Sequence, residues 1–169
     1  QQKLRNSRVA IAGMGGVGGG HLATLARLGI TRFRIADPDH YDLANINRQY
    51  GASYSTVGQP KVEVMARIAR DINPEIEVDA WERPLDKDNC HDFLDGVDVL
   101  LDGMDLLRTD VRRKAFNVAA EQGTHVVTAG PFGFSIGWMV FEPGGIAFDD
   151  YFDMHDGQSP FEQMLHFIG

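Results

Sequence analysis

An apolar run that ends at a glycine-rich loop is the feature that most constrains the fold of this chain. Residues 8–12 read Arg-Val-Ala-Ile-Ala, and residues 13–18, which follow, read Gly-Met-Gly-Gly-Val-Gly. Apolar residues then recur at helical spacing up to Leu28, where Gly29 is expected to end the helix in the left-handed conformation. Residues 31–37, Thr-Arg-Phe-Arg-Ile-Ala-Asp, supply a second strand pattern. The pattern therefore predicts a strand, a glycine turn, a helix and a second strand, which together form one βαβ unit.

Strands and helices continue to alternate through the rest of the chain. We expect further strands over residues 76–80, 97–102 and 124–129, and helices over residues 60–73, 87–94 and 109–122. Such alternation predicts an α/β fold with a Rossmann-like, doubly wound and mainly parallel sheet. Residues 136–141 form another strand pattern with no helix after it, so an added antiparallel C-terminal segment is expected.

A chain of 169 residues is long enough for one domain with a sizeable core. We predict a Rossmann-like nucleotide-binding domain over residues 1–148 and a tail over residues 149–169. The tail contains aromatic residues in a weak pattern, and such side chains more often dock on a surface or a second subunit than fold alone. It is therefore predicted to be a crossover or dimer-contact segment, in a chain that is possibly a fragment of a longer protein.

Composition excludes several classes of protein. The formal charge of −8 argues against general electrostatic binding to nucleic acid. Neither a signal-peptide core nor an apolar run of about 18 residues is present, so the cytoplasm is the expected location. A single cysteine, Cys90, excludes an internal disulfide and a cysteine-only zinc site, and we expect it to be structural.

The glycine loop predicts a nucleotide site. Glycines let backbone amides approach an anion, and the N-terminus of the following helix adds partial positive charge. Asp37 ends the second strand, where an acidic residue commonly accepts hydrogen bonds from ribose hydroxyls. Both NAD and ATP would satisfy these features.

Four residues downstream favour a triphosphate over a dinucleotide. They are Asn45, Arg48, Lys61 and Asp105. Arg48 offers a planar fork for phosphate oxygens, and Lys61 offers a point charge at a helix N-terminus. Asp105 follows a predicted parallel strand and is suited to bind Mg²⁺. A nicotinamide dinucleotide needs no such set of two cations and a carboxylate.

These motifs resemble the ThiF/MoeB/HesA family of ATP-dependent adenylating enzymes, which are related to ubiquitin-activating enzymes. The resemblance extends from about Ser7 to Pro143. Besides the glycine loop, it is carried by Asp37-Pro38-Asp39, Asn45-Ile46-Asn47-Arg48-Gln49, Val57-Gly58-Gln59-Pro60-Lys61, Ile72-Asn73-Pro74 and Asp102-Gly103-Met104-Asp105.

The resemblance implies an activity and a set of site residues. In this family the C-terminal carboxylate of a small ubiquitin-like sulfur carrier or peptide, often ending in Gly-Gly, attacks the α-phosphorus of ATP and releases pyrophosphate. Arg48, Lys61 and Asp105 would be catalytic, with Asp105 holding Mg²⁺, and a homodimer is implied. The implied nucleotide contacts are Gly13, Gly15, Gly16, Gly18, Asp37, Asn45, Asn47, Arg48, Gln49, Lys61 and Asp105.

The chain also departs from the family pattern. Leu106 stands where Asn is common and Ala44 where Ser is common. The paired Cys-x-x-Cys zinc motifs of many members are absent, so no zinc is expected, and no cysteine follows Asp105 as a thioester nucleophile. The alternatives left open are an ATP-dependent dehydratase of a modified tRNA adenosine, a non-catalytic nucleotide-binding subunit and, outside the family, an NAD-dependent oxidoreductase. Neither the carboxylate substrate nor the acceptor of the acyl group can be read from the sequence.

Overall fold

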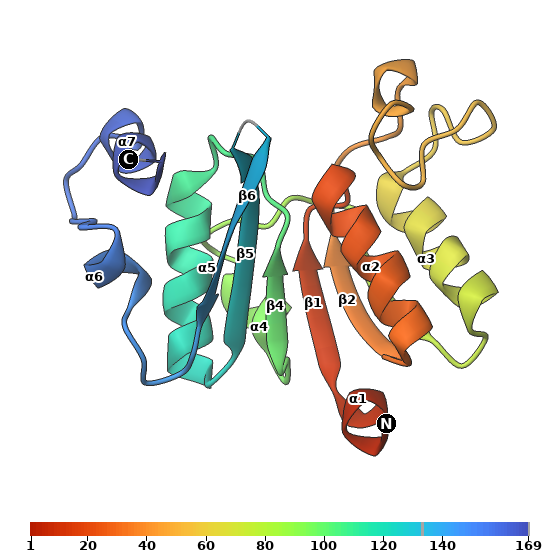
Figure 1. Cartoon of the computed structure of the whole chain (residues 1–169), viewed down its shortest axis with the longest axis horizontal. Coiled ribbons are helices and arrows are strands. Elements are labelled where there is room, and N and C mark those ends of the chain that lie inside the picture. Colours follow the sequence, from red (N-terminus) through yellow and green to blue (C-terminus); the bar gives the residue numbers. More distant parts are fainter. Residues whose placement is uncertain (133, 169) are drawn as a thin grey trace.

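The computed structural model, which describes residues 1–132 and 134–168, is built on one six-stranded sheet with helices on both faces (Figure 1). The strand order is β3-β2-β1-β4-β5-β6. The strands are β1 (Arg8–Ala12), β2 (Arg32–Ala36), β3 (Glu77–Trp81), β4 (Val99–Asp102), β5 (His125–Phe132) and β6 (Ser135–Phe141). All neighbouring strands are parallel except β5 and β6, which pair antiparallel. This confirms the predicted α/β sheet with its added antiparallel segment.

The helices are α1 (Gln2–Asn6), α2 (Gly16–Leu28), the 3₁₀ turn η1 (Leu43–Asn45), α3 (Lys61–Ile72), α4 (Cys90–Leu94), α5 (Thr109–Gln122), α6 (Phe148–Tyr151) and α7 (Pro160–Ile168). Helices α2 to α5 follow the expected alternation. The expectation of no helix after β6 was wrong, because α6 and α7 pack their aromatic residues on α5 and the local sequence pattern does not reveal that contact. Gly29 and Gly123 end α2 and α5 with φ angles of 99° and 75°, a conformation in which a side chain is strained. Helix α3 begins at Lys61, as predicted from Pro60.

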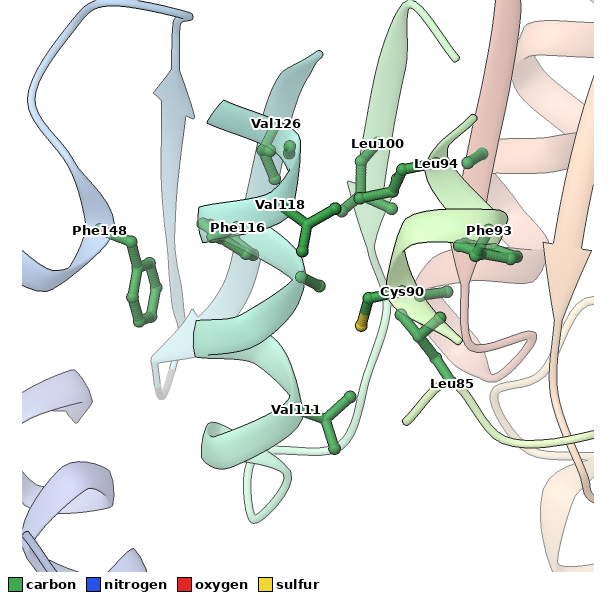
Figure 2. Packing of buried hydrophobic residues seen from close by; sticks show 14 of the residues in the cluster. Leu85, Cys90, Phe93, Leu94, Leu100, Val111, Phe116, Val118, Val126 and Phe148 are labelled. Atoms are coloured by element: carbon green, nitrogen blue, oxygen red, sulfur yellow. The ribbon is translucent and has the colours of Figure 1, made fainter. Parts of the chain in front are cut away.

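Two apolar clusters cover the two faces of the sheet. Successive strand residues point to opposite faces, so Ala10 and Ala12 of β1 lie in one cluster while Val9 and Ile11 lie in the other. The first cluster packs against α4 and α5 (Figure 2), and the second packs against α2 and α3. Strand β4 is paired on both edges and its residues contribute to both clusters, which explains its apolar sequence.

The C-terminal aromatic residues pack on α5. Phe148, Phe152 and Phe167 join Phe116 and Phe141 in the first cluster, with ring centroids 4.5 to 6.3 Å apart between contacting pairs. Other aromatic residues of this segment stay exposed, namely Tyr151 and Phe161. The assignment of residues 149–169 as a crossover or dimer-contact segment stays a prediction, and Gly169 lies outside the described residues, as does Gly133.

Among the described helices, none combines the length and the apolar character that crossing a membrane requires.

Candidate functional site

A cavity of about 460 Å³ lies at the carboxyl ends of β1, β2 and β4. Strand β1 is paired with β2 on one edge and with β4 on the other, so the loops after these three strands meet. The predicted site residues that line the cavity are Gly13, Gly15, Gly16, Asp37, Arg48, Gln49, Lys61 and Asp105. Residues separated by up to 92 positions in sequence are therefore brought together.

The glycine loop passes close to the backbone of the loop after β4. Gly13 has a φ of +92°, and its amide donates a hydrogen bond to the carbonyl oxygen of Ala36 at 2.8 Å. The amide of Gly103 donates to the carbonyl oxygen of Ala12 at 2.8 Å. A Cβ atom on Gly18 would overlap the carbonyl oxygen of Gly13. Gly18 is thus required by packing beneath the loop and does not line the cavity.

The N-terminus of α2 opens onto the cavity. The helix begins at Gly16, five positions before the apolar periodicity starts at His21. Gly15 and Gly16 both line the cavity. The first amides of a helix have no partner within the helix and carry partial positive charge, so this end favours a bound anion.

Asp37 is held against the glycine loop. Its Oδ2 accepts a hydrogen bond from the amide of Met14 at 2.7 Å, and its Oδ1 accepts one from the amide of Asp39 at 2.8 Å. Burial raises the pKa of the Asp37 carboxyl, and the two backbone donors and Lys61 oppose that rise. The carboxylate keeps unused lone pairs for further donors.

Lys61 is buried in an ion pair. Its Nζ lies 2.8 Å from Oδ2 of Asp39 and 3.9 Å from Oδ1 of Asp37, and the residue is only 5% exposed. Sequence spacing did not reveal this contact, which joins residues 22 positions apart. An ammonium group has three donors, so Lys61 can hold Asp39 and still donate to a ligand.

Arg48 is presented by a capped 3₁₀ turn. Asp42 and Asn45 form a reciprocal capping box around η1, in which the Asp42 amide donates to Oδ1 of Asn45 at 3.0 Å. One guanidinium nitrogen of Arg48 donates to the carbonyl of Ala44 and to Oδ1 of Asn47, both at 2.9 Å. The Arg48 side chain lines the cavity beside Gly16.

Two predicted contact residues besides Gly18 have other roles. Neither Asn45 nor Asn47 lines the cavity, since the first caps η1 and the second accepts a hydrogen bond from Arg48. Gln49 does line it, and is 8% exposed with a buried Oε1 that has no partner among the described residues.

Asp105 lies on the loop after β4 and lines the cavity. Its backbone oxygen accepts hydrogen bonds from the amide of Arg108 at 3.0 Å and from Arg112 at 3.2 Å. Its carboxylate is exposed and makes no hydrogen bond or ion pair within residues 1–132 and 134–168. In that same part of the chain, no three His, Cys, Asp or Glu residues form a group able to hold a metal ion alone. A single carboxylate of this kind still fits Mg²⁺, which is usually held by one or two carboxylates together with substrate phosphates.

Apolar residues also line the cavity, and the sequence did not predict them as site residues. They are Val17, Ala36, Pro84, Leu85, Met104 and Leu106. Arg108 also lines the cavity and donates to the carbonyl of Leu85 at 3.2 Å. Pro84 and Leu85 belong to the connection between β3 and α4, which carries no motif, so no local signal pointed to them.

Cys90 lies in the first apolar cluster near Leu85, with its sulfur directed toward α5 (Figure 2). It is fully buried, and its Sγ donates to the carbonyl of Asp86 at 2.9 Å. Burial raises the pKa of the thiol to about 11. These properties agree with a structural cysteine.

Comparison with known proteins identifies relatives along most of the chain. The sequence profile of the ThiF family matches residues 1–166. The tRNA threonylcarbamoyladenosine dehydratase of Bacillus subtilis is 46% identical over 108 residues, which are 63% of this chain and 42% of that protein. The sulfur carrier protein ThiS adenylyltransferase of Escherichia coli is 33% identical over 143 residues, which are 85% of this chain and 56% of that protein. The chain thus spans about half the length of these relatives.

A solved structure of a tRNA threonylcarbamoyladenosine dehydratase is also similar to this chain. The Escherichia coli tRNA N6-threonylcarbamoyladenosine dehydratase TcdA, crystallised in complex with ATP, superposes with a TM-score of 0.74 at 31% identity. The match covers 80% of this chain and 56% of the TcdA chain.

Proposed function

This chain belongs to the ThiF family, and we propose that it binds ATP with Mg²⁺ in the cavity and adenylates a carboxylate. The observation that carries the proposal is the mixed lining of the cavity. The lining contains three cations, the N-terminus of α2, several apolar side chains, and the carboxylate of Asp105, which has no partner among the described residues. An ATP molecule has the matching parts, since it joins an apolar base to a polyanion that binds Mg²⁺.

Each group of lining residues contacts a different portion of ATP in the proposed complex. The adenine ring packs on Leu85 and Met104, and the ribose hydroxyls donate to the free lone pairs of Asp37. The phosphates lie at the N-terminus of α2, within reach of the donors of Arg48 and of Lys61, which also pairs with Asp39. Asp105 would hold Mg²⁺. ATP bound to the related TcdA supports this choice of nucleotide.

The proposed reaction forms one bond and breaks one bond at the α-phosphorus of ATP. A carboxylate oxygen attacks the phosphorus, the bond to the bridging oxygen of the β-phosphate breaks, and the products are an acyl adenylate and pyrophosphate. Arg48 and Lys61 stabilise the charge that develops on the leaving pyrophosphate. Bound Mg²⁺ supplies further neutralisation of charge. Positioning and electrostatic stabilisation account for the catalysis, and no covalent intermediate with the chain is required.

As the substrate we propose the C-terminal carboxylate of a small ubiquitin-like carrier or peptide that ends in Gly-Gly. The Escherichia coli relative, named for its action on the sulfur carrier ThiS, supports this substrate because it aligns with 85% of the chain.

A second candidate is the dehydration of a threonylcarbamoyl-modified adenosine in tRNA. It is favoured by the 46% identity with the Bacillus subtilis dehydratase. The threonyl group carries a free carboxylate, so the same adenylation step would activate it. The net charge of −8 favours the carrier over tRNA for this chain.

Exchange of radiolabelled pyrophosphate into ATP tests the proposal. We expect exchange with Escherichia coli ThiS or with a synthetic peptide ending in a free Gly-Gly carboxylate, and none with the same peptide ending in an amide. Exchange supported only by tRNA that contains threonylcarbamoyladenosine, with loss of one water from that nucleoside, would identify the second candidate. Binding of ATP without exchange on any of these would indicate a non-catalytic nucleotide-binding subunit.

Replacing Arg48 by alanine is expected to lower the exchange rate by about a hundredfold or more, because one preorganised positive group is lost from the leaving pyrophosphate. Circular dichroism and the melting temperature should stay unchanged, since Arg48 is exposed. Arg67→Ala is the matched control, because Arg67 is an exposed arginine that bonds Gln59 and does not line the cavity. Full exchange by Arg48→Ala would refute the assigned role.

We also propose that the chain works as a homodimer in the cytoplasm, as its resemblance to adenylating enzymes implies. Residues 149–169 would then lie at the contact between subunits or cross over the domain. Sedimentation equilibrium at micromolar concentration tests this, and a monomer at all concentrations would contradict it.

A further inference from the structure

A buried ion pair lies directly behind the loop that carries Asp105. Arg112 of α5 and Asp102 at the end of β4 are 2% and 4% exposed, and Nε of Arg112 donates to Oδ2 of Asp102 at 2.7 Å. Asp102 also accepts from the hydroxyl of Thr128 at 2.8 Å and from the amide of Met104 at 3.0 Å. The pair is therefore fully hydrogen-bonded, which a buried pair needs in order to persist.

The same guanidinium holds the backbone of the Asp105 loop. Nη2 of Arg112 donates to the carbonyl oxygen of Met104 at 2.8 Å and to that of Asp105 at 3.2 Å, and Nη1 donates to that of Leu106 at 3.4 Å. Three consecutive carbonyls are thus fixed by one side chain. Because the Asp105 carboxylate has no partner of its own among the described residues, its position depends on this backbone.

The free face of the guanidinium is covered by the C-terminal helix. The ring of Phe167 in α7 lies over Arg112, with 4.7 Å between the ring centroid and Cζ of the guanidinium. Figure 1 shows α7 beside α5, and the two helices are in contact. A stack between an arginine and an aromatic ring in a desolvated setting is among the stronger contacts of this type.

We propose that Arg112 is a positioning residue that links the Asp105 loop to helix α7, so that α7 docking and occupancy of the cavity stabilise each other. One side chain touches both elements, and removing α7 exposes the guanidinium to water and weakens its hold on the three carbonyls. By thermodynamic linkage, a ligand that orders the Asp105 loop also strengthens the docking of α7. The link between loop and helix stands on the geometry alone, whereas its effect on ATP and Mg²⁺ rests on the proposed function.

Hydrogen exchange of the ligand-free chain tests the link without reference to activity. We expect Phe167→Ala to raise the exchange rate of the amides in residues 103–108 by about tenfold, since the desolvated stack on Arg112 is lost. Phe161→Ala is the matched control, because Phe161 is an exposed aromatic residue of the same helix, outside the cluster that contains Phe167. Equal exchange of the loop in Phe167→Ala and in the unmodified chain would overturn the proposal.

Arg112→Lys tests the positioning role directly. Lysine keeps the charge beside Asp102 but lacks the planar fork that reaches several carbonyls at once. We expect the Mg²⁺ concentration for half-maximal pyrophosphate exchange to rise about tenfold, with kcat recovering at saturating Mg²⁺. A purely structural role would lower kcat at every Mg²⁺ concentration and leave the midpoint unchanged, which would contradict the proposal.

A double variant keeps the test valid if Arg112→Lys folds poorly. The double variant Asp102→Asn with Arg112→Met removes the buried charges together, yet still releases the three carbonyls, and is expected to exchange the loop amides as fast as Phe167→Ala. If ATP fails to bind any variant or the unmodified chain, the proposed function is wrong while the exchange result on the loop still decides the link.

Discussion

Four aspartates in and near the cavity are the same residue type but lie in four different environments. Asp37 accepts hydrogen bonds from two backbone amides, and Asp39 forms an ion pair with Lys61. Asp102 is buried against Arg112. Within the part of the chain that the structure describes, Asp105 alone of these four keeps an unpaired carboxylate at the cavity. This difference, and not residue type, makes Asp105 the group suited to an external cation.

Cys90 provides a prediction at the residue scale. Its thiol pKa of about 11, raised from 9.0 by burial, keeps the native thiol protonated at pH 8. Alkylation by iodoacetamide at pH 8 should therefore be at least about a hundredfold slower in the native chain than in 6 M urea, where the ordinary pKa returns. In the unfolded chain the thiol returns to its ordinary pKa and loses its proton at a lower pH than in the native chain. The free energy of unfolding therefore falls as pH rises from about 9 toward 11. Rapid alkylation of the native chain would show that Cys90 is accessible.

Helix α2 and the glycine loop approach each other closely because glycine, which has no side chain, occupies their contact. Helix α2 begins within the glycine run, and Gly18 packs against the carbonyl of Gly13 with no room for a Cβ atom. Helical periodicity could not reveal this start, because glycines give no apolar pattern. The start at Gly16 is seen only in the structure, where Gly18 of the first turn lies against the carbonyl of Gly13.

Gly18→Ala and Gly20→Ala form a matched pair in this helix. Gly18→Ala should lower the free energy of unfolding by about 1–3 kcal/mol, because the new methyl group overlaps the backbone of the glycine loop. Gly20→Ala meets no atom within 4 Å and should raise it by up to about 1 kcal/mol through helix propensity. Urea denaturation measures both. A similar change in the two variants would mean that crowding at Gly18 has no effect.

On the scale of the whole molecule, the cavity lies where the strand order reverses, between β1 and β4. Strand β1 is followed by α2 on one face, and its neighbour β4 is followed by α5 on the other. Ligands of open α/β sheets bind beyond the carboxyl ends of strands at such a point. The glycine loop and the Asp105 loop come from these two strands, so the topology itself brings both loops to one cavity.

Ligand binding should therefore stabilise the folded molecule as a unit. ATP with Mg²⁺ at a hundred times its dissociation constant is expected to add about 2.7 kcal/mol to the free energy of unfolding. NADH at the same concentration should give no stabilisation. Thermal unfolding at matched protein concentration provides the measurement. Stabilisation by NADH alone would favour the oxidoreductase alternative.

The sequence by itself determined the order and type of the elements and the motif residues that reach the cavity. These depend on local spacing and on near neighbours, as in the α3 start at Lys61 and the glycine cap at Gly29. Only the tertiary structure decided which motif side chains line the cavity. It set Asn45 into a cap, paired Lys61 with Asp39, and brought apolar residues such as Leu85 to the cavity. It also joined Arg112, Asp102 and Phe167, because contacts between distant residues follow from strand order and helix packing, which local spacing does not contain.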